Sequence, residues 1–220
     1  MDLNVLMVDD HPPIIEGYKS ILSFNPNGYN LNTVAAYSCE AAYYIITEKL
    51  KPIAFDIVLV DVTLPPFQEK NMESGEDLVL LVKKHLPEAK IIMLTSHSES
   101  LVLYRILNEC QPDGLLVKSD FLSEEFLIAF DTVVKGGKYY STTVKNQQNE
   151  MSSNVKTLDS YNRQIILLLS QGVKTKNFHD YINLSTSAIE KRKSVIKDYF
   201  GIIKGTDEDI LREARKQGLI

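Results

Sequence analysis

The sequence predicts an α/β protein with a doubly wound, five-stranded parallel sheet, followed by a small all-helical domain. Short apolar runs alternate with segments of helical periodicity up to about residue 137. Residues 138–156 are polar and lack a period, which indicates a linker, and residues 157–220 contain only helical patterns. A length of 220 residues is enough for two small domains.

Five apolar runs are expected to form the strands of the sheet. The first and third runs, residues 3–8 and 55–62, are apolar almost throughout, as is typical of strands that are buried on both faces. The run at 31–36 is weaker, and the last two lie at 90–96 and 114–118. Helical segments separate these runs, so the connections are expected to be crossovers between parallel strands.

Helices are expected between the strands and after the last one. Pro13 suits the first turn of the first helix, Ser38 is a good N-cap for the second, and Pro87 stops the third. The expected helices start at Pro13 and cover residues 38 to about 50, 75–85, 98–110 and 123–136.

The residues after the linker are expected to form four helical segments. Gly172 ends the first of them, and Ser185 and Thr206 have side chains that are preferred at helix N-caps. The expected spans are 159–170, 175–182, 185–200 and 206–217. The order helix, short turn, helix is typical of a helix-turn-helix motif.

Charge is distributed unevenly between the two parts of the chain. Residues 1–154 contain 12 Lys and Arg against 21 Asp and Glu, whereas residues 155–220 contain 12 against 8. An acidic part joined to a basic part favours two domains with different partners, and the basic part is compatible with nucleic acid.

Several protein classes are disfavoured. No stretch approaches the ~20 apolar residues of a membrane helix, and the N-terminus has no signal-peptide pattern. Cys39 and Cys110 are too few and too far apart for a disulfide scaffold or a zinc knuckle. We therefore expect a cytoplasmic protein without a membrane partner.

Polar residues follow the apolar runs at the points where the strands should end. Asp9 and Asp10 follow the first strand, Asp61 the third, Thr95 the fourth and Lys118 the fifth. Ligands bind at this edge of a parallel sheet, and a hard cation such as Mg²⁺ would relieve the repulsion between the carboxylates. Asp61 could then act as a nucleophile toward phosphorus. Taken singly, each residue also fits a helix cap, a strand position or a surface charge.

The motifs VLMVDDHP, IVLVDVTLPP, IIMLTS and GLLVK resemble the receiver domain of two-component response regulators, over residues 1–137. The resemblance implies a flavodoxin-like fold in which Asp61 accepts a phosphoryl group from a phosphohistidine on a sensor histidine kinase. Thr95 and Lys118 would read the phosphorylated state. The Mg²⁺ ligands that it implies are Asp10, Asp61 and the backbone carbonyl of Thr63, with Asp9 acting through water.

This sequence departs from the receiver pattern in two places. The family usually has an aromatic residue at the switch position three before the lysine, where this chain has Leu115. The loop after the acceptor, residues 66–74, is also longer than usual. Such a loop either gates the approach of a partner or lies free in solvent.

Residues 158–202 resemble the LuxR-type helix-turn-helix of the NarL/FixJ class, and the resemblance extends to Ile220. It implies binding to double-stranded DNA and a homodimer in the active state. The fourth helix commonly supplies the dimer contact in that family, here with Ile210, Leu211 and Ala214. Packing of these three residues within their own domain is an equally good interpretation.

The helix that starts near Ser185 is expected to enter the major groove. The family usually has Thr-Val-Lys where this chain has Ala188-Ile189-Glu190, histidine at Arg192 and asparagine at Val195. A glutamate repels phosphates but can accept from a cytosine amine. The expected DNA contacts are Lys176, Ser187, Glu190, Lys191, Arg192, Ser194 and Lys197.

The leading functional hypothesis is a transcription regulator that is controlled by phosphorylation and catalyses only its own phosphorylation and dephosphorylation. The alternative is a signalling adaptor whose degenerate helix-turn-helix binds proteins, an interpretation that Glu190 supports. A phosphatase-like hydrolase is disfavoured, because its nucleophile and a second acid would lie two residues apart on the first strand.

Overall fold

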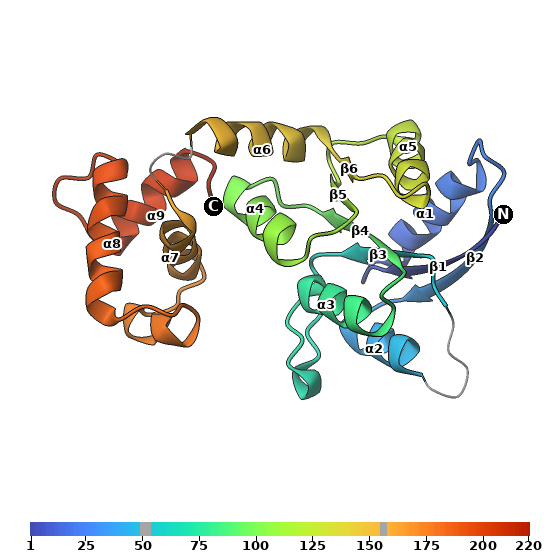
Figure 1. Cartoon of the computed structure of the whole chain (residues 1–220), viewed down its shortest axis with the longest axis horizontal. Coiled ribbons are helices and arrows are strands. Elements are labelled where there is room, and N and C mark those ends of the chain that lie inside the picture. The colour runs from blue at the N-terminus through green and yellow to red at the C-terminus, as the bar shows by residue number, and fades with distance from the viewer. Residues whose placement is uncertain (49–53, 155–157) are drawn as a thin grey trace. The chain divides into compact units, whose positions relative to one another are not determined.

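A computed structural model describes residues 1–48, 54–154 and 158–220, and it describes residues 149–154 by their backbone alone. The predicted helix end near Leu50 and the predicted boundary between linker and second domain at 156/157 lie outside these ranges. The described residues form two compact units, one of residues 1–96 and 106–144 and one of residues 97–105 and 145–220 (Figure 1).

The first unit contains a parallel sheet of six strands in the order β2-β1-β3-β4-β5-β6. The strands are β1 (Asp2–Val8), β2 (Asn30–Ala36), β3 (Ile57–Asp61), β4 (Lys90–Thr95), β5 (Gly114–Val117) and β6 (Tyr139–Tyr140). The predicted five-stranded sheet is one strand short. The missing strand, β6, has two residues, which is too short to produce an alternating pattern in the sequence.

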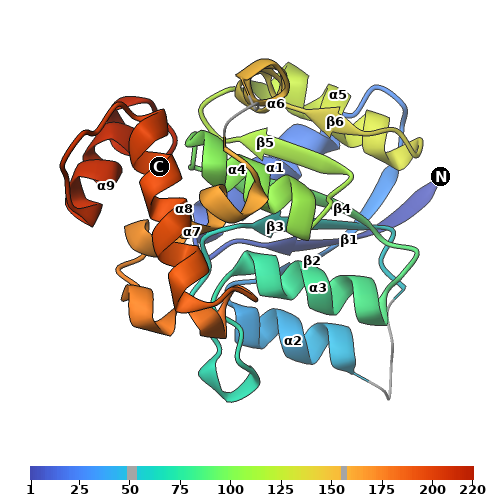
Figure 2. The same cartoon turned by 60° about the vertical axis from the view of Figure 1, so that its left-hand side comes forward.

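Helices cover both faces of this sheet, as the alternating pattern predicts (Figure 1, Figure 2). Helix α1 packs against α5 on one face, and α2 packs against α3 on the other. The helices of the first unit are α1 (Pro12–Ser23), α2 (Cys39–Thr47), α3 (Gly75–His85) and α5 (Ser123–Val134), and α4 (Ser100–Glu109) is divided between the two units. The core beneath α1 and α5 includes Met7, Leu59, Leu116, Phe126 and Phe130.

The described part of the predicted linker, residues 138–156, contains regular structure. After β6 the chain forms helix α6 (Thr142–Asn154). The described side chains of α6 include one fully buried apolar residue, Val144. A helix with so little apolar surface gives no periodic signal, and contacts with residues distant in the sequence hold its start in place.

The second unit has the predicted order of helices. They are α7 (Ser160–Ser170), η2 (Thr175–Asp180), α8 (Thr186–Tyr199) and α9 (Asp207–Lys216). The segment expected as a short α-helix at 175–182 is the 3-10 helix η2. Ser185 caps α8 as predicted, accepting a hydrogen bond from the backbone of Ala188, and Thr206 forms a capping box with Asp209.

The long loop after Asp61 does not lie free in solvent. Phe67 and Met72 are buried and pair with each other in an antiparallel bridge, with η1 (Gln68–Lys70) between them. The Phe67 ring contacts the rings of Tyr43 and Tyr44 on α2, and the Lys70 ammonium lies 5.4 Å from the centre of the Tyr43 ring. Aromatic packing therefore anchors the loop to α2.

None of the helices in the described ranges has the length and hydropathy needed to cross a bilayer.

Candidate functional site

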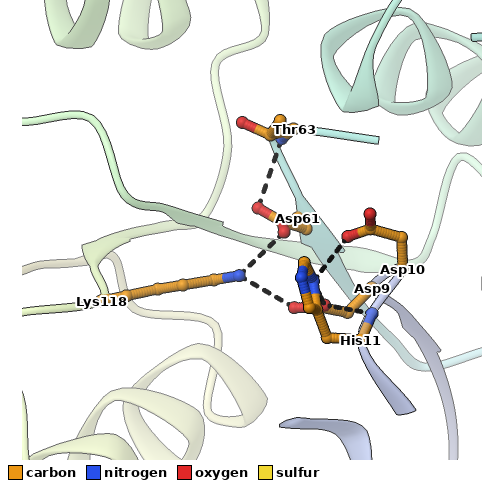
Figure 3. Close-up of polar contacts among 6 residues, drawn as sticks. All are labelled: Asp9, Asp10, His11, Asp61, Thr63 and Lys118. Atoms are coloured by element: carbon orange, nitrogen blue, oxygen red, sulfur yellow. Dashed lines mark hydrogen bonds and ion pairs between the residues drawn. The ribbon is translucent and has the colours of Figure 1, made fainter. Parts of the chain in front are cut away.

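Three charged groups meet at the carboxyl edge of the sheet. The Lys118 ammonium lies 2.9 Å from Asp9 Oδ2 and 2.8 Å from Asp61 Oδ2 (Figure 3). Both carboxylates are almost fully buried, at 2% and 4% exposure. The predicted convergence of these strand ends is therefore present in the structure, and one cation is shared between two buried anions.

Backbone N–H groups fix the other oxygen of each carboxylate. His11 N donates to Asp9 Oδ1 at 2.9 Å, and Thr63 N donates to Asp61 Oδ1 at 3.3 Å. The two acids are thus held by the turns that follow their own strands. Side chains that are held in one orientation lose little conformational freedom when they bind a ligand, which reduces the cost of binding.

Asp10 provides the third carboxylate. Its Oδ1 atom is buried and makes no hydrogen bond with the described residues, although His11 Nδ1 lies 2.8 Å away at ion-pair distance. Ligand atoms of Asp9, Asp10, His11 and Asp61 all lie within 4.8 Å of one another. A buried carboxylate oxygen without a hydrogen bond, in a group of oxygen donors, fits a hard divalent cation such as Mg²⁺.

Burial raises the pKa of Asp61, although the hydrogen bond and charge of Lys118 oppose this effect. The negative charge of Asp9 raises the pKa of Asp61 further. Burial alone would lower the pKa of Lys118, but its hydrogen bonds to Asp61 and Asp9 outweigh burial, so its pKa is raised. Lys118 therefore remains a cation at neutral pH.

Thr95 and Leu115 occupy different positions relative to this cluster. Thr95 ends β4 with a fully buried side chain, and its carbonyl accepts a hydrogen bond from Lys118 N at 2.7 Å. Leu115 lies inside β5, fully buried, beside Tyr140 of β6. The expected switch position is thus filled by an aliphatic side chain of the core.

Gly75 is a part of the site that the sequence indicates only as the start of a helix. Its N–H donates to the carbonyl of Val62 at 2.9 Å. A Cβ atom at Gly75 would lie 1.9 Å from the carbonyl oxygen of Asp61. Only glycine lets the start of α3 approach the backbone of Asp61 so closely.

The residues expected to contact DNA divide into two groups. Ser187, Glu190, Lys191 and Ser194 are exposed on α8, Lys197 is half-buried, and Lys176 is exposed on η2. Arg192 instead binds Asp159, with an Nη1–Oδ2 distance of 2.6 Å, and stacks on the ring of Tyr161. Arg192 therefore holds α8 against the start of α7.

Lys193, the next residue of α8, is buried, at 7% exposure. Its ammonium lies 2.8 Å from Asp207, 3.3 Å from Glu190 and 3.2 Å from the Thr175 hydroxyl. Glu190 is therefore paired with a cation of its own helix, which reduces the repulsion that it would exert on a phosphate.

The dimer candidates on α9 are mostly inside the core of their own unit. Ile210 and Ala214 are fully buried, and Leu211 is partly buried against the same cluster. These positions favour the packing interpretation for Ile210 and Ala214.

The fold and the acidic cluster define the class of this protein. The sequence model of the response regulator receiver domain matches residues 5–124, more than half of the chain. The chain belongs to the response regulator receiver domain family.

Two curated regulators are similar to almost the whole chain. The transcriptional regulatory protein MctR of Rhizobium johnstonii is 23% identical over 99% of this chain and 95% of its own length. The oxygen regulatory protein NreC of Staphylococcus aureus is 25% identical over 91% of this chain and 92% of its own length.

Solved structures have the same fold. A LuxR-family two-component response regulator from Aurantimonas matches with a TM-score of 0.58 and 24% identity, over 70% of this chain and 99% of that chain. RcsB, in a structure of two dimers bound to two parallel DNAs, matches with a TM-score of 0.64 and 20% identity, over 98% of each chain.

Proposed function

We propose that this chain is a DNA-binding transcription regulator controlled by phosphorylation of Asp61. The observation that carries the proposal is the cluster at the edge of the sheet, where Lys118 bridges Asp9 and Asp61 and Asp10 has a buried oxygen without a hydrogen bond. A sensor histidine kinase would supply the phosphoryl group. The chemistry of the chain is limited to its own phosphorylation and dephosphorylation.

A carboxylate oxygen of Asp61 forms a bond to phosphorus while the bond from phosphorus to the histidine nitrogen breaks. Lys118 neutralises charge on the transferring oxygens, and the Thr95 hydroxyl donates to the phosphoryl group of the product. Asp10, Asp61 and the Thr63 carbonyl would hold Mg²⁺, with Asp9 acting through water. When bound, Mg²⁺ supplies positive charge for the same oxygens.

Phosphorylation can be tested with a small phosphodonor. The wild-type chain, incubated with Mg²⁺ and acetyl phosphate, is expected to gain one phosphoryl group, measured by intact mass. Asp61→Asn should abolish the gain because an amide is not a nucleophile. Asp131→Asn, at a carboxylate paired with Lys135 on α5, is the matched control and should be labelled normally. A full label on Asp61→Asn would mean that the acceptor is another residue.

DNA binding is proposed for the exposed face of α8. Ser187, Lys191 and Ser194 lie there, and among the described residues no ion pair engages Lys191 or Lys197. Two relatives are transcriptional or oxygen regulatory proteins, and RcsB, which has the same fold, was solved on DNA. Lysine can contact phosphates or guanine edges, and serine can contact either strand.

A mobility-shift assay against genomic fragments, with and without acetyl phosphate, tests this part of the proposal. Binding that strengthens on phosphorylation supports a transcription regulator. No shift in either state would favour the signalling adaptor. The pairing of Glu190 with Lys193 weakens the main support for that alternative.

A further inference from the structure

A single carboxylate joins the loop after β5 to the start of α6. Asp120 Oδ2 accepts from the Ser141 hydroxyl at 2.6 Å and from Thr143 N at 2.8 Å, and Asp120 Oδ1 accepts from the Thr143 hydroxyl at 2.8 Å. Asp120 thus binds the residues immediately before and inside the first turn of a helix 21–23 positions later in the sequence. The start of α6 lies beside β6, at the edge of the sheet (Figure 1).

The contact is built into the interior rather than lying on the surface. Ser141 is fully buried, its hydroxyl also accepts from Val117 N at 3.1 Å, and its own N–H donates to the carbonyl of Leu115 at 3.0 Å. Loss of this arrangement would leave a buried N–H without a partner, which is costly. The start of α6 is therefore tied to β5 at more than one point.

The same loop contains Lys118, which pairs with Asp61. Asp120 N donates to the carbonyl of Val117 at 2.9 Å, which closes the turn around Lys118. The Lys118 ammonium lies 2.8 Å from Asp61. Hydrogen bonds thus connect Asp61 to Lys118, the turn at 117–120, and the start of α6.

We propose that Asp120 is a positioning residue that couples the state of Asp61 to helix α6, the helix that leads along the chain to residues 158–220. This inference rests on the proposed phosphorylation of Asp61. A phosphoryl group adds negative oxygens within reach of Lys118 and strengthens its ion pair. The stronger ion pair restrains Lys118 and so reduces the motion of the turn that contains Asp120. Asp120 then restrains the first turn of α6 more strongly.

An ordinary helix cap would produce a different result. A cap stabilises its helix equally in both states of Asp61. A coupling residue instead changes the difference in the stability of α6 between the phosphorylated and unphosphorylated states of Asp61. That difference, and not the basal stability of α6, is the quantity to measure.

Hydrogen exchange of the 220-residue chain measures this difference in α6 directly. With Mg²⁺ and acetyl phosphate, backbone amides 145–148 of α6 in the wild-type chain are expected to exchange about tenfold more slowly than without the phosphodonor. Asp120→Asn should lose this slowing while taking up the label on Asp61 normally. Thr143→Val, which removes the hydroxyl at constant volume, should reduce the slowing, and Thr143→Ser, which keeps the hydroxyl, should restore it.

Ser38→Ala is the matched control, because Ser38 caps α2 next to the opposite edge strand β2. It should keep the wild-type difference in α6. Wild-type slowing in a fully labelled Asp120→Asn chain would overturn the inference, as would a labelled wild-type chain without any slowing. If Asp120→Asn does not fold, the comparison of Thr143→Val with Thr143→Ser tests the inference instead. Equal slowing of exchange in these two variants would overturn the inference. A wild-type chain that takes up no label contradicts the proposed function itself.

Discussion

Gly75 and Asp61 depend on each other through their backbones. The first residue of α3 approaches the Asp61 carbonyl so closely that a side chain at position 75 would have to displace it. The position of the proposed phosphoacceptor therefore depends partly on the absence of a Cβ atom at Gly75. Gly75 comes later in the sequence than Asp61 but lies next to it in space.

Gly75→Ala is expected to destabilise the fold by about 1–3 kcal/mol, as overpacking of a buried site does. It should also slow phosphorylation of Asp61, because the added carbon displaces the acceptor backbone. Urea denaturation and the rate of label uptake measure the two effects. Gly17→Ala is the control: Gly17 lies in the interior of α1 with open space around it, and alanine there should stabilise by about 0.5–1 kcal/mol. Unchanged stability and labelling in Gly75→Ala would contradict the close approach.

The raised pKa of Asp61 predicts how stability depends on pH. Its folded-state pKa lies above the ordinary value of 3.8, mainly because of burial, so the folded state binds this proton more tightly than the unfolded state. Stability is thus lost as pH rises from the unfolded pKa through the folded pKa.

In the absence of divalent cations, Asp61→Asn is therefore expected to be more stable than the wild type at pH 7, and the difference should vanish as pH falls below the ordinary carboxyl pKa. Added Mg²⁺ should stabilise the wild type more than the variant, because a ligand that binds only the folded state adds to its stability. Urea denaturation at several pH values, with chelator or with Mg²⁺, measures both effects. A wild type that is the more stable at pH 7 without metal would contradict the raised pKa.

Helix α8 places its cations in two different environments. Lys193 and Arg192 are engaged by acids of the same unit, whereas Lys191 is exposed. Residue type alone therefore does not show which of these three adjacent residues is available for the proposed contact with DNA.

Lys191→Ala and Arg192→Ala form a matched pair. Lys191→Ala should leave the free energy of unfolding unchanged and cost ~1–3 kcal/mol in binding to the preferred DNA site, if Lys191 reads a base edge. Arg192→Ala should lower the free energy of unfolding through the lost contacts with Asp159 and Tyr161. Chemical denaturation and DNA titration separate the two effects. A lower free energy of unfolding in Lys191→Ala, together with an unchanged one in Arg192→Ala, would contradict the structure of α8.

The contributions of charge and packing at the buried Lys193 can be separated by comparing a truncation with a substitution of similar volume. Lys193→Ala is expected to destabilise by about 2–5 kcal/mol, because it leaves a cavity and removes the partner of Asp207. Lys193→Met fills the space and should cost less, since apolar replacement of a buried charge is often tolerated. Thermal or urea unfolding gives both values. Equal losses in the two variants would show that the charge, and not the packing, dominates.

The distribution of charge along the chain bears on the proposed DNA binding. The chain has a net charge of −5, and its basic excess is confined to residues 155–220. A modest excess limits the affinity of one domain for DNA, so two linked half-sites would be needed for tight binding.

Phosphorylation is therefore expected to favour a homodimer, with binding that falls steeply as salt rises. Sedimentation with and without acetyl phosphate measures the association. Lys176→Ala should weaken binding to all sequences alike and lower the salt slope by about one unit, as the loss of one phosphate contact does. A monomer in both states over a wide concentration range would contradict the dimer, and an unchanged salt slope would remove Lys176 from the contact surface.

The class of the fold and the composition of the acidic cluster are predictable from the order of residues along the chain. Asp9, Asp61 and Lys118 each follow an apolar run, and the carboxyl ends of parallel strands lie at one edge of a sheet. The helix caps at Ser38 and Ser185 were predictable for a similar reason, since a cap interacts with backbone only a few residues away.

Features that depend on residues distant in the sequence are visible only in the folded chain. The strand β6, the start of α6 and the burial of Lys193 each need partners at least 14 positions away. The same is true of Phe67, which packs on the rings of α2. Local periodicity carries no information about such partners, because their stabilising energy arises when separate elements pack together.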